Sequence, residues 1–193
     1  MDDLTQRLEY LVDRLKTAYD SVGHSSGRPY IYLVYPPQEE RALRRLADEL
    51  LRDTESHRFH HIDILEVAVD SLRGKEEQRE ELLANPTAEA NATQSILRLW
   101  ARRIAGLVKE RLSLPGPGRP VVVLRGLAAL HPLGNPTTLM ESIAEGEPHD
   151  PVTNRVVPLV LLVPGLRPPG ASRTYDFLGR EDLRLQFYRG EEV

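Results

Sequence analysis

The sequence predicts a single α/β domain in which a mostly parallel sheet of about five strands is flanked by helices. Three observations support this prediction. The chain has 193 residues, which suits one domain. Strand-like and helix-like segments alternate along it, and the strand-like segments are continuous apolar runs. Strands that are apolar throughout are covered on both faces, so we expect helices on each side of the sheet.

An amphipathic helix opens the chain and is expected to pack on the domain, which spans residues 1–193. Apolar side chains recur every three or four positions within residues 1–22, and Asp2 or Asp3 stands where it can cap the N-terminus. The glycines and serines of residues 23–27 predict the end of this helix.

The other elements follow from the same kinds of pattern. Runs of β-branched and aromatic residues predict strands, apolar stripes predict helices, and Pro and Gly predict the loops between them. The predicted strands are residues 30–35, 59–67, 121–124 and 156–163, with a half-exposed edge strand at 183–188. The predicted helices are residues 43–53, 96–112 and 136–145, with a charged segment at 68–85 that is either helical or partly mobile.

Composition limits the possible classes of function. The chain has no cysteine, which excludes disulfides, thiolate zinc sites and cysteine nucleophiles. Its N-terminus carries acids where a signal peptide carries bases, and its longest apolar stretches are about half the length of a membrane span. We therefore expect a soluble, cytoplasmic protein with no membrane contact.

Charge is unevenly distributed along the chain. The formal net charge of −4 argues against a general coat for nucleic acid. Residues 86–125 nevertheless hold seven bases and two acids, whereas residues 66–84 hold six acids and three bases. Such asymmetry indicates either a partner surface or ordinary solvated helix faces.

The layout is that of a P-loop nucleotide-binding protein without its phosphate-binding loop. After the strand at 30–35, Pro36 and Pro37 remove two backbone donors, and Glu39 and Glu40 would repel a phosphate. The chain contains neither Gly-Lys-Ser/Thr nor Gly-x-Gly-x-x-Gly, and Arg125 follows the third strand where a metal-holding acid would stand. We therefore expect no nucleotide cofactor.

The sequence also gives little support for a metal site or a catalytic nucleophile. On a strand, His61 and Asp63 share one face, with His60 on the other, so one face holds a fragment of a metal site. A third ligand is missing, and hydrogen-bonded or solvated histidines are the preferred interpretation. The strand–turn–helix motif Gly-x-Ser-x-Gly of serine hydrolases is absent. The chain is expected to have no catalytic residue and no metal.

Two groups of basic residues are candidates for contact with a partner. Arg125, His131, Arg167 and Arg173 follow predicted strands and can form a basic rim for an acidic protein or a phosphate backbone. Exposed loop arginines without a function are the alternative. The second group, on the long helix, lacks the interleaved aromatics of a single-strand binding platform. It consists of Arg98, Arg102 and Arg103.

Four segments, in order, resemble the BrxB family, which are small accessory proteins of bacterial BREX phage-defence systems. They are residues 30–41 (YIYLVYPPQEER), 121–132 (VVVLRGLAALHP), 158–165 (PLVLLVPG) and 175–189 (YDFLGREDLRLQFYR). The chain departs from the family pattern at Arg125-Gly126, where Thr-Gly is usual, and at His131-Pro132, where Tyr-Pro is usual.

The resemblance implies a biological role. It implies a non-catalytic adaptor subunit of a BREX anti-phage system, acting through protein–protein contacts, with the alkaline-phosphatase-like PglZ subunit as its expected partner. The family has no catalytic residues to carry over. A DNA-binding accessory protein of the same system is the alternative.

Overall fold

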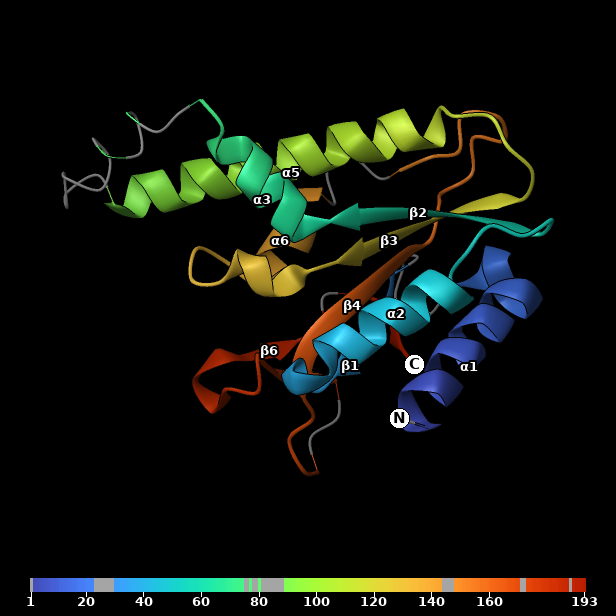
Figure 1. Ribbon diagram of the computed structural model, residues 1–193, viewed down its shortest axis with the longest axis horizontal. Helices are drawn as coiled ribbons and strands as arrows, with labels where there is room; N and C mark the ends of the chain where they lie inside the picture. Colours follow the sequence, from blue (N-terminus) through green and yellow to red (C-terminus); the bar gives the residue numbers. More distant parts are fainter. Residues whose placement is uncertain are drawn as a thin grey trace.

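The computed structural model describes residues 2–22, 30–74, 77, 80, 89–143, 148–170, 173–187 and 189–193. In this part of the chain a mostly parallel sheet is flanked by helices on both faces, which confirms the predicted fold class (Figure 1). The predicted loop at 23–27, most of the segment at 75–85, and Tyr188 lie outside the described residues.

Five strands form one parallel sheet in the order β2-β3-β4-β1-β7. They are β1 (Tyr30–Tyr35), β2 (His57–Asp63), β3 (Arg119–Arg125), β4 (Leu159–Leu166) and β7 (Glu191–Glu192). After β1 the chain crosses to the far edge of the sheet at β2 and returns through β3 to β4, which pairs with β1. Because these strands are parallel, the carboxyl ends of β1 to β4 lie along one edge, where open α/β sheets bind ligands.

Helices cover the two faces of the sheet and enclose two hydrophobic cores. The helices α1 (Asp2–Ala18) and α2 (Glu40–Leu50) cover one face, and α3 (Ile64–Leu72), α5 (Glu89–Leu112) and α6 (Pro136–Ile143) cover the other (Figure 1). Alternate residues of β1 enter opposite cores, and all six are buried. This two-sided burial explains the continuous apolar sequence of the strand.

A small antiparallel extension leaves the end of β4. The strand β5 (Thr174–Phe177) pairs with β4, and β6 (Arg184–Gln186) pairs with β5. The Arg184 guanidinium donates to both carboxylate oxygens of Asp176, at 2.7 and 3.2 Å, and so ties β6 to β5. The predicted edge strand at 183–188 is thus shorter, and it does not belong to the parallel sheet.

Several predicted boundaries were wrong for local reasons. The second strand ends at Asp63 rather than at residue 67, because the Asp63 carboxylate accepts the Leu65 N–H at 3.0 Å and caps α3. The fourth strand starts at Leu159, just after Pro158, which has no N–H for a ladder hydrogen bond.

Two short helical segments complete the approach to the carboxyl edge of the sheet. The 3₁₀ helix Pro37–Glu39 leads from β1 into α2, and the 3₁₀ helix Leu127–Leu130 follows β3. Within the described residues, none of the helices has the length and apolar character needed to cross a membrane.

Candidate functional site at the carboxyl edge of the sheet

Charged side chains meet where three strands of the sheet end. Tyr35, Asp63 and Arg125 are the last residues of β1, β2 and β3, and one face of α2 lies beside them. That face contributes Glu40, Arg44 and Asp48, which stand four residues apart and so point to the same side of the helix. We call these six residues, Tyr35, Glu40, Arg44, Asp48, Asp63 and Arg125, the carboxyl-edge cluster.

Asp63 lies at the centre of the carboxyl-edge cluster. Its side chain is only 5% exposed. One carboxylate oxygen accepts the Arg44 Nη1 at 2.5 Å and lies 3.5 Å from the Arg125 Nε, while the other caps α3. A buried carboxylate is stable when cations and N–H donors surround it, and Asp63 has both.

Arg44 joins Asp63 to the end of β1. Its Nε donates to the Glu40 carboxylate at 2.7 Å, and the Tyr35 hydroxyl donates to the same carboxylate. Burial, reinforced by the hydrogen bond to Glu40, raises the pKa of Tyr35 well above its ordinary value. The Tyr35 hydroxyl therefore stays protonated and acts as a donor.

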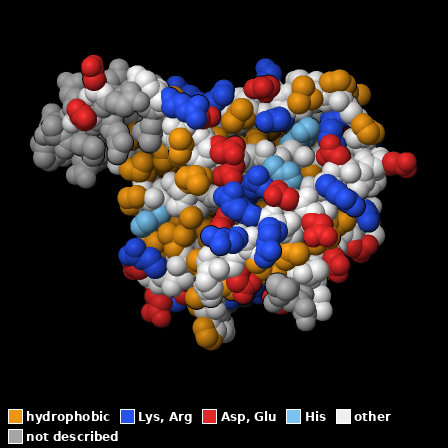
Figure 2. Space-filling model, in the orientation of Figure 1, with side chains coloured by type: hydrophobic (Ala, Val, Ile, Leu, Met, Phe, Trp, Pro, Cys, Tyr) orange, Lys and Arg blue, Asp and Glu red, His pale blue; other side chains and the backbone are white. Residues whose placement is uncertain are grey.

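Arg125 connects the end of β3 to α2. Its Nη1 donates to the Asp48 carboxylate at 2.5 Å, and its side chain is 20% exposed. Figure 2 shows basic and acidic side chains interleaved in the middle of this face of the molecule. Each acid of the carboxyl-edge cluster thus contacts at least one cation.

Gly126 is required next to this cluster. Its φ is +68°, in the left-handed region that glycine tolerates best. A Cβ at this position would lie 2.3 Å from the Asp63 Oδ1 and 3.0 Å from the Arg44 Nη2. The Arg125-Gly126 pair therefore supplies both a cation for Asp63 and the space that Asp63 and Arg44 occupy.

The arrangement leaves little chemistry available at this edge. The three acids accept hydrogen bonds from the two arginines and a tyrosine hydroxyl, and the Arg125 Nε, which has no hydrogen bond within the described residues, lies in ion-pair contact with Asp63. Across the described ranges, no group of three or more His, Asp or Glu side chains is placed to hold a metal ion. The carboxyl-edge cluster occupies the edge with its own side chains.

The histidines of β2 make separate contacts rather than one site. The His61 Nε2 donates to the Leu51 carbonyl at 2.7 Å, the His60 Nε2 accepts from Arg58, and the His57 Nδ1 lies 3.0 Å from the Ser56 hydroxyl. Burial lowers the pKa of all three imidazoles, which favours their neutral forms. The predicted His61–Asp63 pair does not converge on a ligand, because Asp63 is held by arginines.

The proposed basic rim is divided among different contacts. Arg125 belongs to the carboxyl-edge cluster, and Arg167 forms an ion pair with Glu192 on β7, its Nε at 2.5 Å. His131 is half-buried after the second 3₁₀ helix, and Arg173 is exposed with a φ of +61°. The structure therefore does not bring these four side chains into one free basic surface.

The arginines of the long helix are placed differently. Arg98, Arg102 and Arg103 are all exposed on α5. Among the described residues, no acid lies within ion-pair distance of them. In this they differ from Arg125 and Arg167, which form ion pairs.

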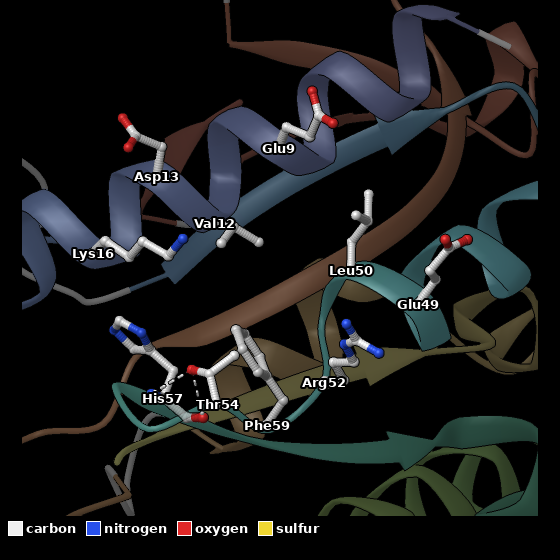
Figure 3. Close-up of a pocket in the computed structure, with 10 residues that line it drawn as sticks. All are labelled: Glu9, Val12, Asp13, Lys16, Glu49, Leu50, Arg52, Thr54, His57 and Phe59. Atoms are coloured by element: carbon white, nitrogen blue, oxygen red, sulfur yellow. Dashed lines mark hydrogen bonds between the residues drawn. The ribbon is translucent and has the colours of Figure 1, made fainter.

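A groove between α1 and the end of α2 escaped the sequence analysis. It has a volume of about 320 Å³, and Val12, Leu50 and Phe59 supply its apolar walls (Figure 3). Its other lining residues are Glu9, Asp13, Lys16, Glu49, Arg52, Thr54 and His57. The groove forms where α1 packs beside α2, so its lining residues are far apart in the sequence and no local sequence pattern predicts it. Of the cluster residues on α2, only Glu40 was named from the sequence; Arg44 and Asp48 were missed, although the spacing of four was visible.

Comparisons with known proteins add no relative. No family model, no curated protein and no solved structure matches this chain. The structure thus shows an α/β domain in which ion pairs and hydrogen bonds join the carboxyl ends of β1, β2 and β3 to α2.

Proposed function

We propose that this protein is a non-catalytic adaptor subunit that acts through protein–protein contacts. One observation carries the proposal: the carboxyl-edge cluster fills the edge where a sheet of this type binds its ligand. A fold that keeps its scaffold while closing its ligand edge is suited to present surfaces to other proteins.

Opening the carboxyl edge to a ligand would be energetically unfavourable. A phosphate bound by Arg44 or Arg125 would have to compete with Asp63, which would then be a buried carboxylate with fewer cations. Leaving one member of a buried ion pair unpaired costs about 3–5 kcal/mol. The loop after β1 offers little in return, because Pro36 and Pro37 have no N–H to donate.

The resemblance to the BrxB family gives the proposal its biological setting. The segments that carry it include β1 and most of β3 and β4. Segments 30–41 and 121–132 contain Tyr35, Glu40 and Arg125 of the carboxyl-edge cluster. On this basis we propose a cytoplasmic accessory protein of a BREX anti-phage defence system, with a PglZ-type subunit as its partner.

Co-purification tests this function. The tagged chain is co-expressed with each protein encoded beside it, and complexes are resolved by size-exclusion chromatography. We expect a stable complex with a PglZ-type protein, and no turnover of ATP, GTP or phosphoesters by the chain alone with Mg²⁺ or Mn²⁺. The proposal is contradicted if the chain binds none of the BREX components. It is also contradicted if the wild-type chain turns over one of these substrates and Arg44→Ala does not.

A DNA-binding accessory role is the second candidate, and the exposed arginines of α5 favour it. Arg98, Arg102 and Arg103 contact no acid of the described residues, so they are available to phosphates. This role predicts DNA retention that weakens steeply with salt and falls when Arg102 and Arg103 are changed to Glu. Absence of binding at about 50 mM salt would remove this candidate.

A further inference from the structure

The outer face of α5 carries an excess of basic side chains and lies on one side of the molecule. The inner side of the helix is buried through Trp100, Ile104, Val108 and Leu112, spaced by four. Half a turn away, the exposed residues of the outer face are Arg98, Leu99, Arg102, Arg103, Ala105, Gly106, Lys109 and Glu110. Figure 1 shows α5 as the outermost helix on its side, and Figure 2 shows basic side chains along the same edge.

The cations of this face differ from many arginines elsewhere in the fold. Arg14, Arg44 and Arg184, for example, each lie within ion-pair distance of an acid on another element. For Arg102 and Lys109, no acid in the described part of the chain lies within that distance. Arginine is enriched where proteins bind one another, so an arginine-rich face that is exposed and forms no ion pair with the described acids suits an interface.

Gly106 is the second, independent observation. It lies inside a helix of 24 residues, where glycine is among the least favourable choices. A Cβ built at Gly106 would meet nothing within 4 Å in the described part of the chain, so packing against these residues does not require a glycine there. A bare backbone on an exposed face allows another chain to approach closely.

The surroundings of Gly106 indicate what kind of chain approaches. Its neighbours one turn away are Arg102, Arg103, Lys109 and Glu110, three bases and one acid. Leu99, two turns before Gly106, is 41% exposed and supplies an apolar contact. A small, partly apolar centre surrounded by charge is the anatomy of a protein interface, and the excess of bases selects an acidic partner.

We propose that the outer face of α5 is the docking surface for an acidic amphipathic helix of a protein partner. The helix crosses α5 at Gly106, packs an apolar side chain against Leu99 and places carboxylates against Arg102 and Lys109. This inference rests on the proposed adaptor function and names its binding surface. A phosphate backbone is less favoured, since Leu99 and Gly106 offer it no hydrogen bond.

Photo-crosslinking in cells identifies the occupant. The full chain carries benzoylphenylalanine in place of Leu99, or in place of Tyr10 on α1 as a control that is 57% exposed. We expect the Leu99 probe to crosslink peptides of one protein, rich in Asp and Glu with apolar residues three or four apart, about tenfold above the control. Crosslinks to nucleic acid, or to peptides without excess acids, overturn the inference.

Two matched variant pairs then test the contact. Gly106→Leu and Gly106→Ala both favour the helix, but only the leucine fills the space above it. We expect Gly106→Leu to weaken binding of the crosslinked protein tenfold or more and Gly106→Ala to leave it unchanged. Reversing Arg102 and Arg103 to Glu should also abolish binding, whereas reversing the exposed Arg41 and Arg45 of α2 should not.

The outcomes separate this inference from the function on which it rests. If the wild-type chain forms its complex and Gly106→Leu binds as tightly, the surface is elsewhere and the adaptor function stands. If the wild-type chain forms no protein complex, the adaptor function fails and this inference fails with it. Melting temperatures at or above the wild-type value in both glycine variants establish that lost binding is not unfolding.

Discussion

Arginines at the carboxyl edge of the sheet and arginines on the outer face of α5 differ in what surrounds them. Arg44 and Arg125 are 31% and 20% exposed and hold acids from neighbouring elements. Arg102 and Arg103 are exposed and contact no acid of the described residues. The same side-chain type is therefore held by ion pairs at one surface and exposed, without an ion pair to the described acids, at the other.

The comparison shows why residue type alone is a poor guide to binding surfaces. Arg125 is placed at the edge where ligands bind in this architecture, and from its position it is a strong candidate for contact. Asp48 and Asp63 neutralise it, so it stabilises the fold instead. Arg102 lies on the outer face of α5, where no acid of the described residues is within ion-pair distance.

The largest expected effect comes from a substitution that disrupts the carboxyl-edge cluster. Asp63→Ala leaves Arg44 and Arg125 without their shared acid and removes the cap of α3. We expect it to lower the free energy of unfolding by about 3 kcal/mol, at the lower end for buried pairs because both arginines are partly exposed. Urea denaturation measures this loss, and Asp63→Asn, which keeps the cap, should lose less. A change in Asp63→Ala no larger than in the exposed Asp182→Ala would refute the role given to Asp63.

A second variant tests the space beside Asp63. Gly126→Ala places a methyl group against the Asp63 carboxylate at a left-handed φ, and we expect it to cost about 2 kcal/mol or more in unfolding free energy. Gly170→Ala has a similar φ of +72° but no neighbour within 4 Å, so it should cost about 1 kcal/mol. The difference between the two isolates the contact with Asp63. Equal losses would mean that backbone strain alone sets the cost.

A pH series tests β2, the strand that contributes Asp63 to the carboxyl-edge cluster, because it carries three histidines whereas the helix α5 carries none. Burial lowers the pKa values of His57, His60 and His61 below 6.5 in the folded protein. The unfolded chain therefore binds more protons below about pH 6.5, and the free energy of unfolding falls as the pH falls. One extra proton gives a slope on the order of 1 kcal/mol per pH unit.

Denaturation at pH 7.5, 6.5 and 5.5 measures this slope. His61→Gln removes one titrating group and keeps a donor for the Leu51 carbonyl, so its slope should be smaller. If His61→Gln and the wild-type chain show the same slope, the loss of stability at low pH comes from the carboxylates instead.

The smallest expected effect concerns the exposed outer face of α5. Gly106→Ala adds a methyl group in open space on α5 and should raise the free energy of unfolding by about 0.8 kcal/mol, the difference in helix propensity. Thermal and urea denaturation measure it. Gly134→Ala is the control: Gly134 lies outside the helices, so no helix-propensity gain applies, and its Cβ would lie 2.7 Å from the Leu97 side chain. Destabilisation by Gly106→Ala would show that the domain itself needs this glycine.

Much of the fold was predictable because its determinants are local. The apolar run Tyr30–Tyr35 is buried on both faces, and the stripe ending at Leu112 predicted the longest helix. The error at residues 64–67 has a local cause as well, since apolar residues after Asp63 continue the strand pattern while the Asp63 cap starts a helix. Periodicity alone cannot separate a short apolar strand from the first turn of a buried helix.

The sequence by itself determined the strand and helix alternation and the lack of a phosphate-binding loop, because these depend on neighbouring residues. Only the tertiary structure decided which charged side chains form ion pairs and which stay exposed. Arg44 and Asp63 are 19 residues apart, and Asp48 and Arg125 are 77 apart. These pairs meet only because β2 lies beside β3 and α2 packs on that face of the sheet. Local patterns extend over a helical turn or a strand pleat, whereas ion pairing depends on the order of the strands.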